Sequence, residues 1–129
     1  MNDNDPHPDT ATFLAEAQAL LGPRGITTDP DLVTPWLTDW RGRYTGRALA
    51  LASPATTAEV AALVRLCALH GVAIVPQGGN SGMCGGATPD ASGNALLLSL
   101  RRLNALGPVD IDARQVTTGA GVILQTLHE

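Results

Sequence analysis

Residues 76–86 read PQGGNSGMCGG, with five glycines in eleven positions and no charged side chain, directly after the apolar residues VAIV. Glycine lets the backbone approach a ligand closely and adopts conformations closed to other residues. Successive backbone N–H groups in such a loop form a concave anion site, and phosphate is its usual occupant. Loops after buried strands commonly hold ligands in α/β proteins. The stretch predicts a phosphate-binding loop; the alternative is a glycine-rich turn without a ligand.

Other phosphate-binding motifs fit this chain less well. A Walker A loop ends in GK[ST], and the chain has no lysine, which excludes P-loop nucleotidases. The dinucleotide fingerprint GxGxxG opens a helix after the first strand, whereas this spacing is GGxxGxxGG and a further strand is expected after it. A second stretch, Gly119-Ala120-Gly121, lacks the third glycine of that fingerprint. A Rossmann domain is therefore the weaker alternative.

Two helices have clear start and stop signals. The first is expected from residue 10, with Asp9 or Thr10 as N-cap, and stops at Gly22. The second follows a capping box in which Thr56 is the N-cap and Glu59 reaches back to it. Its apolar residues recur at helical spacing up to the stop signal His70-Gly71.

The strands are predicted from short apolar runs. We expect strands at 47–53, 72–76 (buried) and 95–100, and two strands or a hairpin within 109–118, centred near residues 112–113. The loop before them carries at most one short helix, at 30–36, with Trp36 and Trp40 as anchors beneath it. A final helix begins after Gly121. An early βαβ unit followed by further strands indicates an α+β, or mixed α/β, fold.

Composition excludes several classes of partner. The net charge is −4, the eight arginines are scattered, and no basic patch suits nucleic acid. No apolar run approaches the roughly 18–20 residues of a transmembrane segment. The first ten residues are acidic and polar rather than signal-like, so the expected compartment is the cytoplasm. Neither cysteine nor histidine spacing predicts a metal site.

The chain divides into three predicted parts. Residues 1–9 are expected to be a disordered lead-in, residues 10–46 a helix and loop segment, and residues 47–129 the ligand-binding domain. The last residues stop about two turns into an apparent helix without a terminating signal. We therefore expect the domain to be truncated at its C-terminus, as the N-terminal piece of a longer protein; the alternative is that a partner completes the last helix.

The motifs resemble a known flavoprotein superfamily. LASPATTAEVAALVRLCALHGVAIVPQGGNSGMCGGATP, residues 51–89, is similar to the flavin-binding domain of the vanillyl-alcohol-oxidase and p-cresol-methylhydroxylase superfamily. PQGGNSGMCGGATP is most similar to the branch of D-2-hydroxyglutarate dehydrogenases and related D-lactate and glycolate oxidising flavoproteins. The likeness extends over about residues 20–129, including the closing TTGAGVILQTL. It implies the N-terminal part of a PCMH-type FAD-binding domain.

The resemblance implies that the glycine-rich stretch wraps the pyrophosphate of FAD, largely through backbone N–H groups. Superfamily members that tether FAD covalently through this loop usually carry histidine where this chain has Ser81, which implies non-covalent FAD. The residues expected to contact the cofactor are Pro76, Gln77, Gly78, Gly79, Asn80, Ser81, Gly82, Met83, Gly85 and Gly86, with Gly119, Ala120 and Gly121 as a second approach.

The implied function is oxidation of a 2-hydroxy acid, of D configuration, to the 2-keto acid by hydride transfer to FAD. The small hydroxy-acid substrate and the electron acceptor would be met in the intact enzyme, whose catalytic residues lie outside these 129 residues. The chain alone is therefore expected to lack turnover. Two alternatives stay open: another oxidase of the superfamily, acting on an alcohol or sugar, and a stand-alone phosphate-binding or structural module without redox activity.

Overall fold

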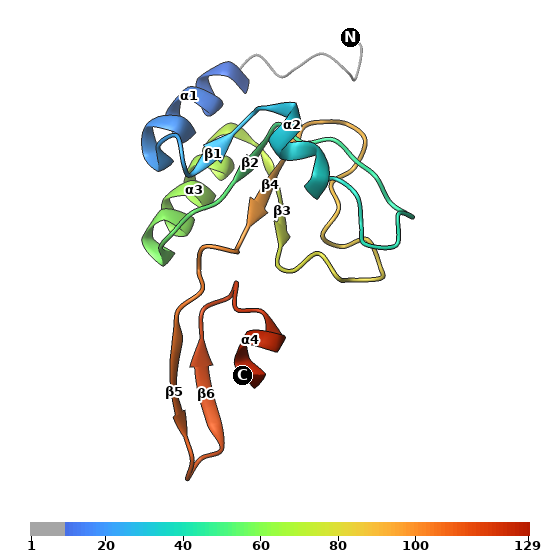
Figure 1. Ribbon diagram of the computed structural model, residues 1–129. Helices are drawn as coiled ribbons and strands as arrows, with labels where there is room; N and C mark the ends of the chain where they lie inside the picture. Colours follow the sequence, from blue (N-terminus) through green and yellow to red (C-terminus); the bar gives the residue numbers. More distant parts are fainter. Residues whose placement is uncertain (1–9) are drawn as a thin grey trace.

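The computed structural model describes residues 10–129, so the predicted lead-in and the N-cap alternative Asp9 lie outside the described residues. A four-stranded sheet carries helices on its faces, and a separate two-stranded hairpin extends away from this body (Figure 1). The mixed α/β class predicted from the sequence is confirmed. None of the helices in residues 10–129 has the length and apolar character that a bilayer span requires.

Helix α1 spans Thr10–Leu21 and buries Phe13 and Ala17. It ends as predicted at Gly22, which has a φ of 73° and donates its N–H to the carbonyl oxygen of Gln18 at 2.9 Å. A left-handed glycine satisfies a carbonyl that the helix itself leaves unpaired.

Helix α3 spans Thr57–His70 and has the predicted caps. The hydroxyl of Thr56 accepts a hydrogen bond from the N–H of Glu59 at 3.1 Å. The Glu59 carboxylate in turn accepts from the N–H of Ala55 at 2.8 Å, so the predicted return bond to the cap residue itself is wrong by one position. Gly71, with a φ of 67°, ends the helix as expected.

The main sheet has the strand order β1-β2-β4-β3. Strands β2 and β3 each pair with β4 in parallel, and β1 pairs with β2 antiparallel. Because β4 lies between β2 and β3, the β2-α3-β3 crossover spans two strand positions. The strands are β1 Ile26–Thr27, β2 Ala50–Ala52, β3 Ala73–Gln77 and β4 Ala95–Ser99.

One face of the sheet packs against α1 and α3, which lie side by side in Figure 1. Leu96 and Leu98 of β4 point into this layer, where they meet Phe13 from α1 and Leu63 and Cys67 from α3. Apolar burial of these side chains is the main stabilising contribution to the fold.

The opposite face is covered by two short helices, α2 (Pro30–Val33) and η1 (Thr34–Trp36). Leu51 and Leu97 pack with Val33 there, because successive strand residues point to opposite faces. Residues 30–36 are helical as predicted, but as two consecutive short helices rather than one. Strand β1, two residues long, was not predicted.

Three sequence predictions need correction. Strand β3 is not buried: apart from Gln77 its residues are half-buried or exposed, because β3 is the edge strand of the sheet. The run predicted at 47–53 forms regular strand only over Ala50–Ala52. Trp40 is 58% exposed and anchors nothing beneath the loop, whereas Trp36 is half-buried against the second core cluster.

The predicted hairpin is confirmed but begins earlier than expected. Strand β5 spans Leu106–Asp110 and strand β6 spans Gln115–Thr118, paired antiparallel with an irregularity after Leu106. The Asp110 carboxylate accepts from the N–H of Ala113 at 2.9 Å in the turn between the strands. The last helix, α4, spans Leu124–His128.

Candidate cofactor site

The glycine loop, residues 78–86, leaves the carboxyl end of β3 and lies against the loop that follows η1. The side-chain amide of Asn80 donates to the carbonyl oxygen of Thr38 at 2.9 Å. The guanidinium of Arg41 donates to the carbonyl oxygen of Met83 at 3.3 Å. A segment about 40 positions earlier in the sequence therefore holds the glycine loop in place.

Gln77, which directly precedes the glycine loop, is hydrogen-bonded to Ala87, which directly follows it. Its side chain is 1% exposed, and its amide donates to the carbonyl oxygens of Trp36 at 3.0 Å and Ala87 at 3.1 Å. Its own carbonyl accepts from the N–H of Leu100 at 3.0 Å. The Gln77 side chain is thus committed to internal bonds, since a buried amide is costly to leave unpaired.

Four glycines of the loop have no structural reason to be glycine. Gly78, Gly79, Gly82 and Gly86 have no left-handed φ, and a Cβ added to any of them would meet no atom within 4 Å. The chain has ten other glycines. Each of them has a positive φ, or an added Cβ would lie within 4 Å of a neighbouring atom. These four leave open space along the loop, which fits a ligand that needs close approach to backbone N–H groups.

Gly85 belongs to a different group. It has a φ of 76°, and a Cβ on it would lie 2.9 Å from the ring of Tyr44. Its glycine identity is therefore explained by the turn and by packing, not by a ligand.

The second predicted stretch is also packed tightly. A Cβ on Gly119 would overlap the carbonyl oxygen of Leu103, and a Cβ on Gly121 that of Leu100. The N–H of Gly119 donates to Ala105 at 2.7 Å, and the N–H of Gly121 donates to Leu103 at 2.9 Å. These two N–H groups are used within the chain and are therefore not available to an anion.

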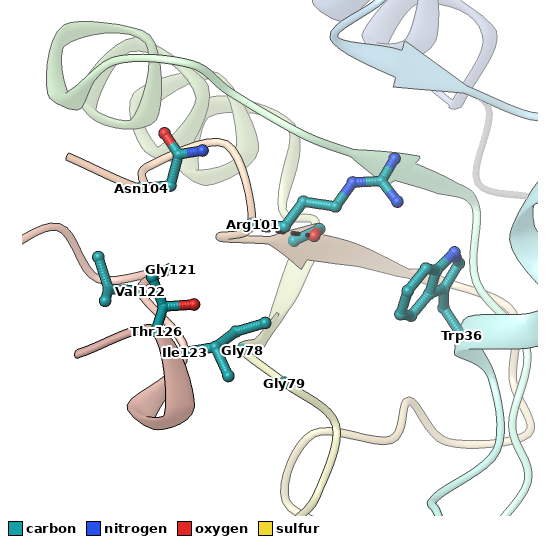
Figure 2. Close-up of a pocket in the computed structure, with 10 residues that line it drawn as sticks. Trp36, Gly78, Gly79, Arg101, Asn104, Gly121, Val122, Ile123 and Thr126 are labelled. Carbon is teal, nitrogen blue, oxygen red and sulfur yellow. Dashed lines mark hydrogen bonds between the residues drawn. The ribbon is translucent and has the colours of Figure 1, made fainter. Parts of the chain in front are cut away.

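A cavity of about 440 Å³ lies beside the start of the glycine loop (Figure 2). It brings together residues from both predicted stretches, Gly78 and Gly79 from the first and Gly121 from the second. The other predicted contact residues do not line it: Pro76, Gln77, Asn80, Ser81, Gly82, Met83, Gly85, Gly86, Gly119 and Ala120.

Seven lining residues were not predicted from the sequence: Trp36, Ser99, Arg101, Asn104, Val122, Ile123 and Thr126. A signal existed for those that follow β4, because the carboxyl ends of neighbouring parallel strands meet at one edge of a sheet. For Trp36, which arrives from η1, the sequence carried no such signal.

The chemistry of the cavity is that of binding. Its lining holds no carboxylate, histidine or cysteine, and Arg101 is its single charged side chain. Within residues 10–129, no three His, Cys, Asp or Glu side chains gather as a metal site would require. The cavity therefore offers backbone groups, apolar surface and one cation, but no general acid or base.

Comparison with known sequences identifies the family. The sequence pattern of the FAD binding domain family matches residues 48–129, more than half of the chain. The chain belongs to this family. FAD is therefore its cofactor, as the resemblance implied. The open glycines fit this cofactor, because its pyrophosphate is an anion that backbone N–H groups can bind where no side chain intervenes.

Two related sequences illustrate the likeness. D-2-hydroxyglutarate dehydrogenase of Xanthomonas citri pv. viticola is 40% identical over 105 residues, covering 80% of this chain and 21% of that protein. Mitochondrial D-2-hydroxyglutarate dehydrogenase of Danio rerio is 36% identical over 118 residues, covering 92% of this chain and 22% of that protein. The chain spans about a fifth of the length of these relatives.

Solved structures share the fold. A substrate-bound p-cresol methylhydroxylase superimposes with a TM-score of 0.78 at 17% identity, covering 95% of this chain and 24% of that one. An alkyldihydroxyacetonephosphate synthase superimposes with a TM-score of 0.75 at 23% identity, covering 99% of this chain and 27% of that one. The PCMH-type fold predicted for this FAD-binding domain is confirmed.

Proposed function

We propose that this domain binds FAD non-covalently along its glycine loop, as the cofactor-binding part of an oxidoreductase that converts a D-2-hydroxy acid to the 2-keto acid. The observation that carries the proposal is the set of four glycines, Gly78, Gly79, Gly82 and Gly86, whose missing side chains serve no internal purpose. The pyrophosphate would lie along their open side, close to the cavity lined by Gly121.

The remaining predicted contacts take different roles in this proposal. Pro76 and Gln77 end strand β3 and set the direction in which the loop leaves the sheet. Asn80 holds the loop to the segment after η1. We assign two groups of residues to the part of FAD that follows the loop and to the opposite side of the cofactor. The first group is Ser81, Gly82, Met83, Gly85 and Gly86, and the second is Gly119, Ala120 and Gly121.

The proposed reaction removes a hydride from C2 of the hydroxy acid and a proton from its hydroxyl group. When bound, FAD supplies the two-electron acceptor for that hydride. The cavity residues exclude water and hold the cofactor, but none of them is a base that could take the hydroxyl proton. That base, and the groups that bind the substrate, would come from outside these 129 residues, which alone would not turn over.

The choice of a hydroxy-acid substrate is supported by the relatives that are D-2-hydroxyglutarate dehydrogenases. An oxidase of other specificity is the alternative, since 6-hydroxy-D-nicotine oxidase of Arthrobacter nicotinovorans is 26% identical with a TM-score of 0.67, covering 81% of this chain and 22% of that one. The cytoplasm stays a prediction, while several relatives are named as mitochondrial proteins.

The glycine-loop assignment is tested by Gly79→Val in the intact protein. A Cβ at Gly79 meets no atom within 4 Å, so the variant should fold normally. We expect FAD affinity, measured by quenching of flavin fluorescence, to fall by at least about tenfold because the new methyl groups occupy the path of the pyrophosphate. Ala91→Val, at an exposed turn, is the matched control and should bind FAD normally. Unchanged affinity in Gly79→Val would contradict the assignment.

Two further measurements address the finer parts of the proposal. Acid precipitation of the flavin-loaded protein should leave all flavin in the supernatant; flavin retained in the pellet would refute non-covalent binding. Anaerobic addition of D-2-hydroxyglutarate should bleach the flavin absorbance of the intact protein, whereas the L isomer should not. Bleaching only by an alcohol or sugar would favour the alternative oxidase.

A further inference from the structure

Arg101 is the one charged residue among those that line the cavity beside the glycine loop. Its side chain extends from the end of β4 toward Trp36 (Figure 2). Among residues 10–129 it forms no salt bridge, since the one ion pair found there joins His70 to Glu16. Its neighbour Arg102 is used differently, because it donates to the carbonyl oxygen of Ser53 at 2.8 Å. The two consecutive arginines thus differ in their contacts: Arg102 joins elements of the fold, and Arg101 lines the cavity next to Trp36.

Trp36 fixes the position of that charge. The guanidinium carbon of Arg101 lies 5.4 Å from the centroid of the indole ring, a cation–π contact. The two side chains lie next to each other along one side of the cavity (Figure 2). Trp36 is itself held, since its carbonyl accepts from Gln77 and its ring packs near Val33 and Leu97. Arg101 is therefore positioned by a residue that is bonded to the start of the glycine loop.

The ligand that the loop is built for is an anion, yet the loop carries no positive charge. Residues 76–86 contain no basic side chain, and the chain has no lysine at all. Backbone N–H groups alone leave the two negative charges of a pyrophosphate uncompensated in a partly enclosed site. A planar guanidinium, with several donors in fixed geometry, is the group best suited to phosphate oxygens.

We propose that Arg101, positioned by Trp36, binds the pyrophosphate of FAD in the cavity that it lines with Gly78 and Gly79. This inference rests on the proposed function of the glycine loop. It makes Arg101 a cofactor-recognition residue and Trp36 a positioning residue, neither of which belongs to the glycine-rich stretch.

The test measures FAD binding to Arg101→Ala and Arg101→Lys in the intact protein, together with displacement of FAD by ADP and by adenosine. Arg101→Ala should weaken FAD and ADP by about 10- to 100-fold, the range for a hydrogen bond to a charged group. Adenosine, which lacks phosphates, should be affected less than about twofold. Arg101→Lys should recover part of the affinity, because it restores the charge but not the fork of donors.

Trp36→Leu tests the positioning role. It should weaken FAD binding less than Arg101→Ala does, and the double variant should bind as weakly as Arg101→Ala alone, because Trp36 acts through the arginine. Raising the NaCl concentration should weaken FAD binding more in the wild type than in Arg101→Ala. Arg65→Ala, which removes an equal charge from helix α3, is the control and should bind FAD normally.

Two results would overturn the inference. FAD affinity unchanged in Arg101→Ala would show that this charge is not used, and equal losses for ADP and adenosine would place Arg101 on the adenosine part of the cofactor. Either result, obtained while Gly79→Val still weakens FAD binding by at least about tenfold, leaves the glycine-loop function intact. Retained binding in Gly79→Val would instead refute the proposed function.

Discussion

The side-chain amide of Asn80 donates to the carbonyl oxygen of Thr38 at 2.9 Å, which joins the glycine loop to a segment 42 positions away. Asn80 also has a φ of 55°, in the left-handed region that asparagine tolerates better than most residues. One residue thus supplies both the turn and the bond that hold the loop open. The shape of the site depends on this contact, since the loop's own glycines contribute no side chains.

Asn80→Ala should loosen the glycine loop before any cofactor is bound. The variant loses a hydrogen bond worth about 1 kcal/mol, and alanine tolerates the left-handed φ of this position less well than asparagine does, at a further cost of up to about 1 kcal/mol. Hydrogen exchange of the loop amides in the FAD-free protein should become faster, and FAD should bind more weakly. Asn80→Gly keeps the turn but loses the bond, so it should lie between alanine and wild type. Equal exchange rates in all three proteins would contradict this role.

Alanine at two cavity-lining glycines should have different effects on stability. Gly121→Ala forces a Cβ against the carbonyl oxygen of Leu100 and should lower the free energy of unfolding by about 1–3 kcal/mol, as overpacking does. Gly78→Ala has open space and should change it by less than about 0.5 kcal/mol while weakening FAD binding. Urea unfolding of the FAD-free protein measures both. A destabilised Gly78→Ala would show that the loop is packed.

The local parts of this fold could be predicted from sequence because their causes lie within a few residues. Thr56 and Gly71 are cap signals that act over one helical turn, and both take the expected role in α3, while the Glu59 carboxylate bonds one residue earlier than predicted. The sheet order could not be predicted, since placing β4 between β2 and β3 depends on long-range pairing. Strand β1 is two residues long and too short to show any periodicity.

The candidate site likewise has a part that could be predicted from the sequence and a part that could not. Its glycine loop is recognisable because missing side chains are visible in a sequence. The partners of the loop are not, because the carbonyl oxygens of Thr38, Trp36 and Ala87 accept its bonds, and a carbonyl is present at every position. Arg101 and Arg102 are likewise adjacent and identical in sequence, and their different surroundings appear only in three dimensions.

Thr56→Ala should lower the free energy of unfolding by about 1 kcal/mol. The variant removes the acceptor for the N–H of Glu59 at the start of α3, and loss of an N-cap costs about 0.5–2 kcal/mol. Thr56→Ser keeps the hydroxyl and should unfold at nearly the wild-type urea concentration. FAD affinity should stay the same in both, because this cap does not line the cavity. An alanine variant as stable as the serine variant would contradict the cap assignment.

The buried thiol of Cys67 should make the stability of the protein fall at alkaline pH. Burial raises the pKa of this thiol from its ordinary value of 9.0 to about 11, because a thiolate loses its hydration in the core. Between these two values the folded protein keeps a proton that the unfolded chain releases. Raising the pH through this window therefore favours unfolding, with no contribution from this group below about pH 9.

The measurement is the free energy of unfolding in urea at pH 8, 9, 10 and 11, compared between wild type and Cys67→Ala. The alanine variant has no titrating group at this position and should show a smaller decline above pH 9, whatever stability it loses by shortening a buried side chain in α3. Cys84→Ser removes the exposed cysteine and should retain the wild-type decline. If Cys67→Ala declined as steeply as wild type between pH 9 and 11, the buried thiol would not be the source of the pH dependence.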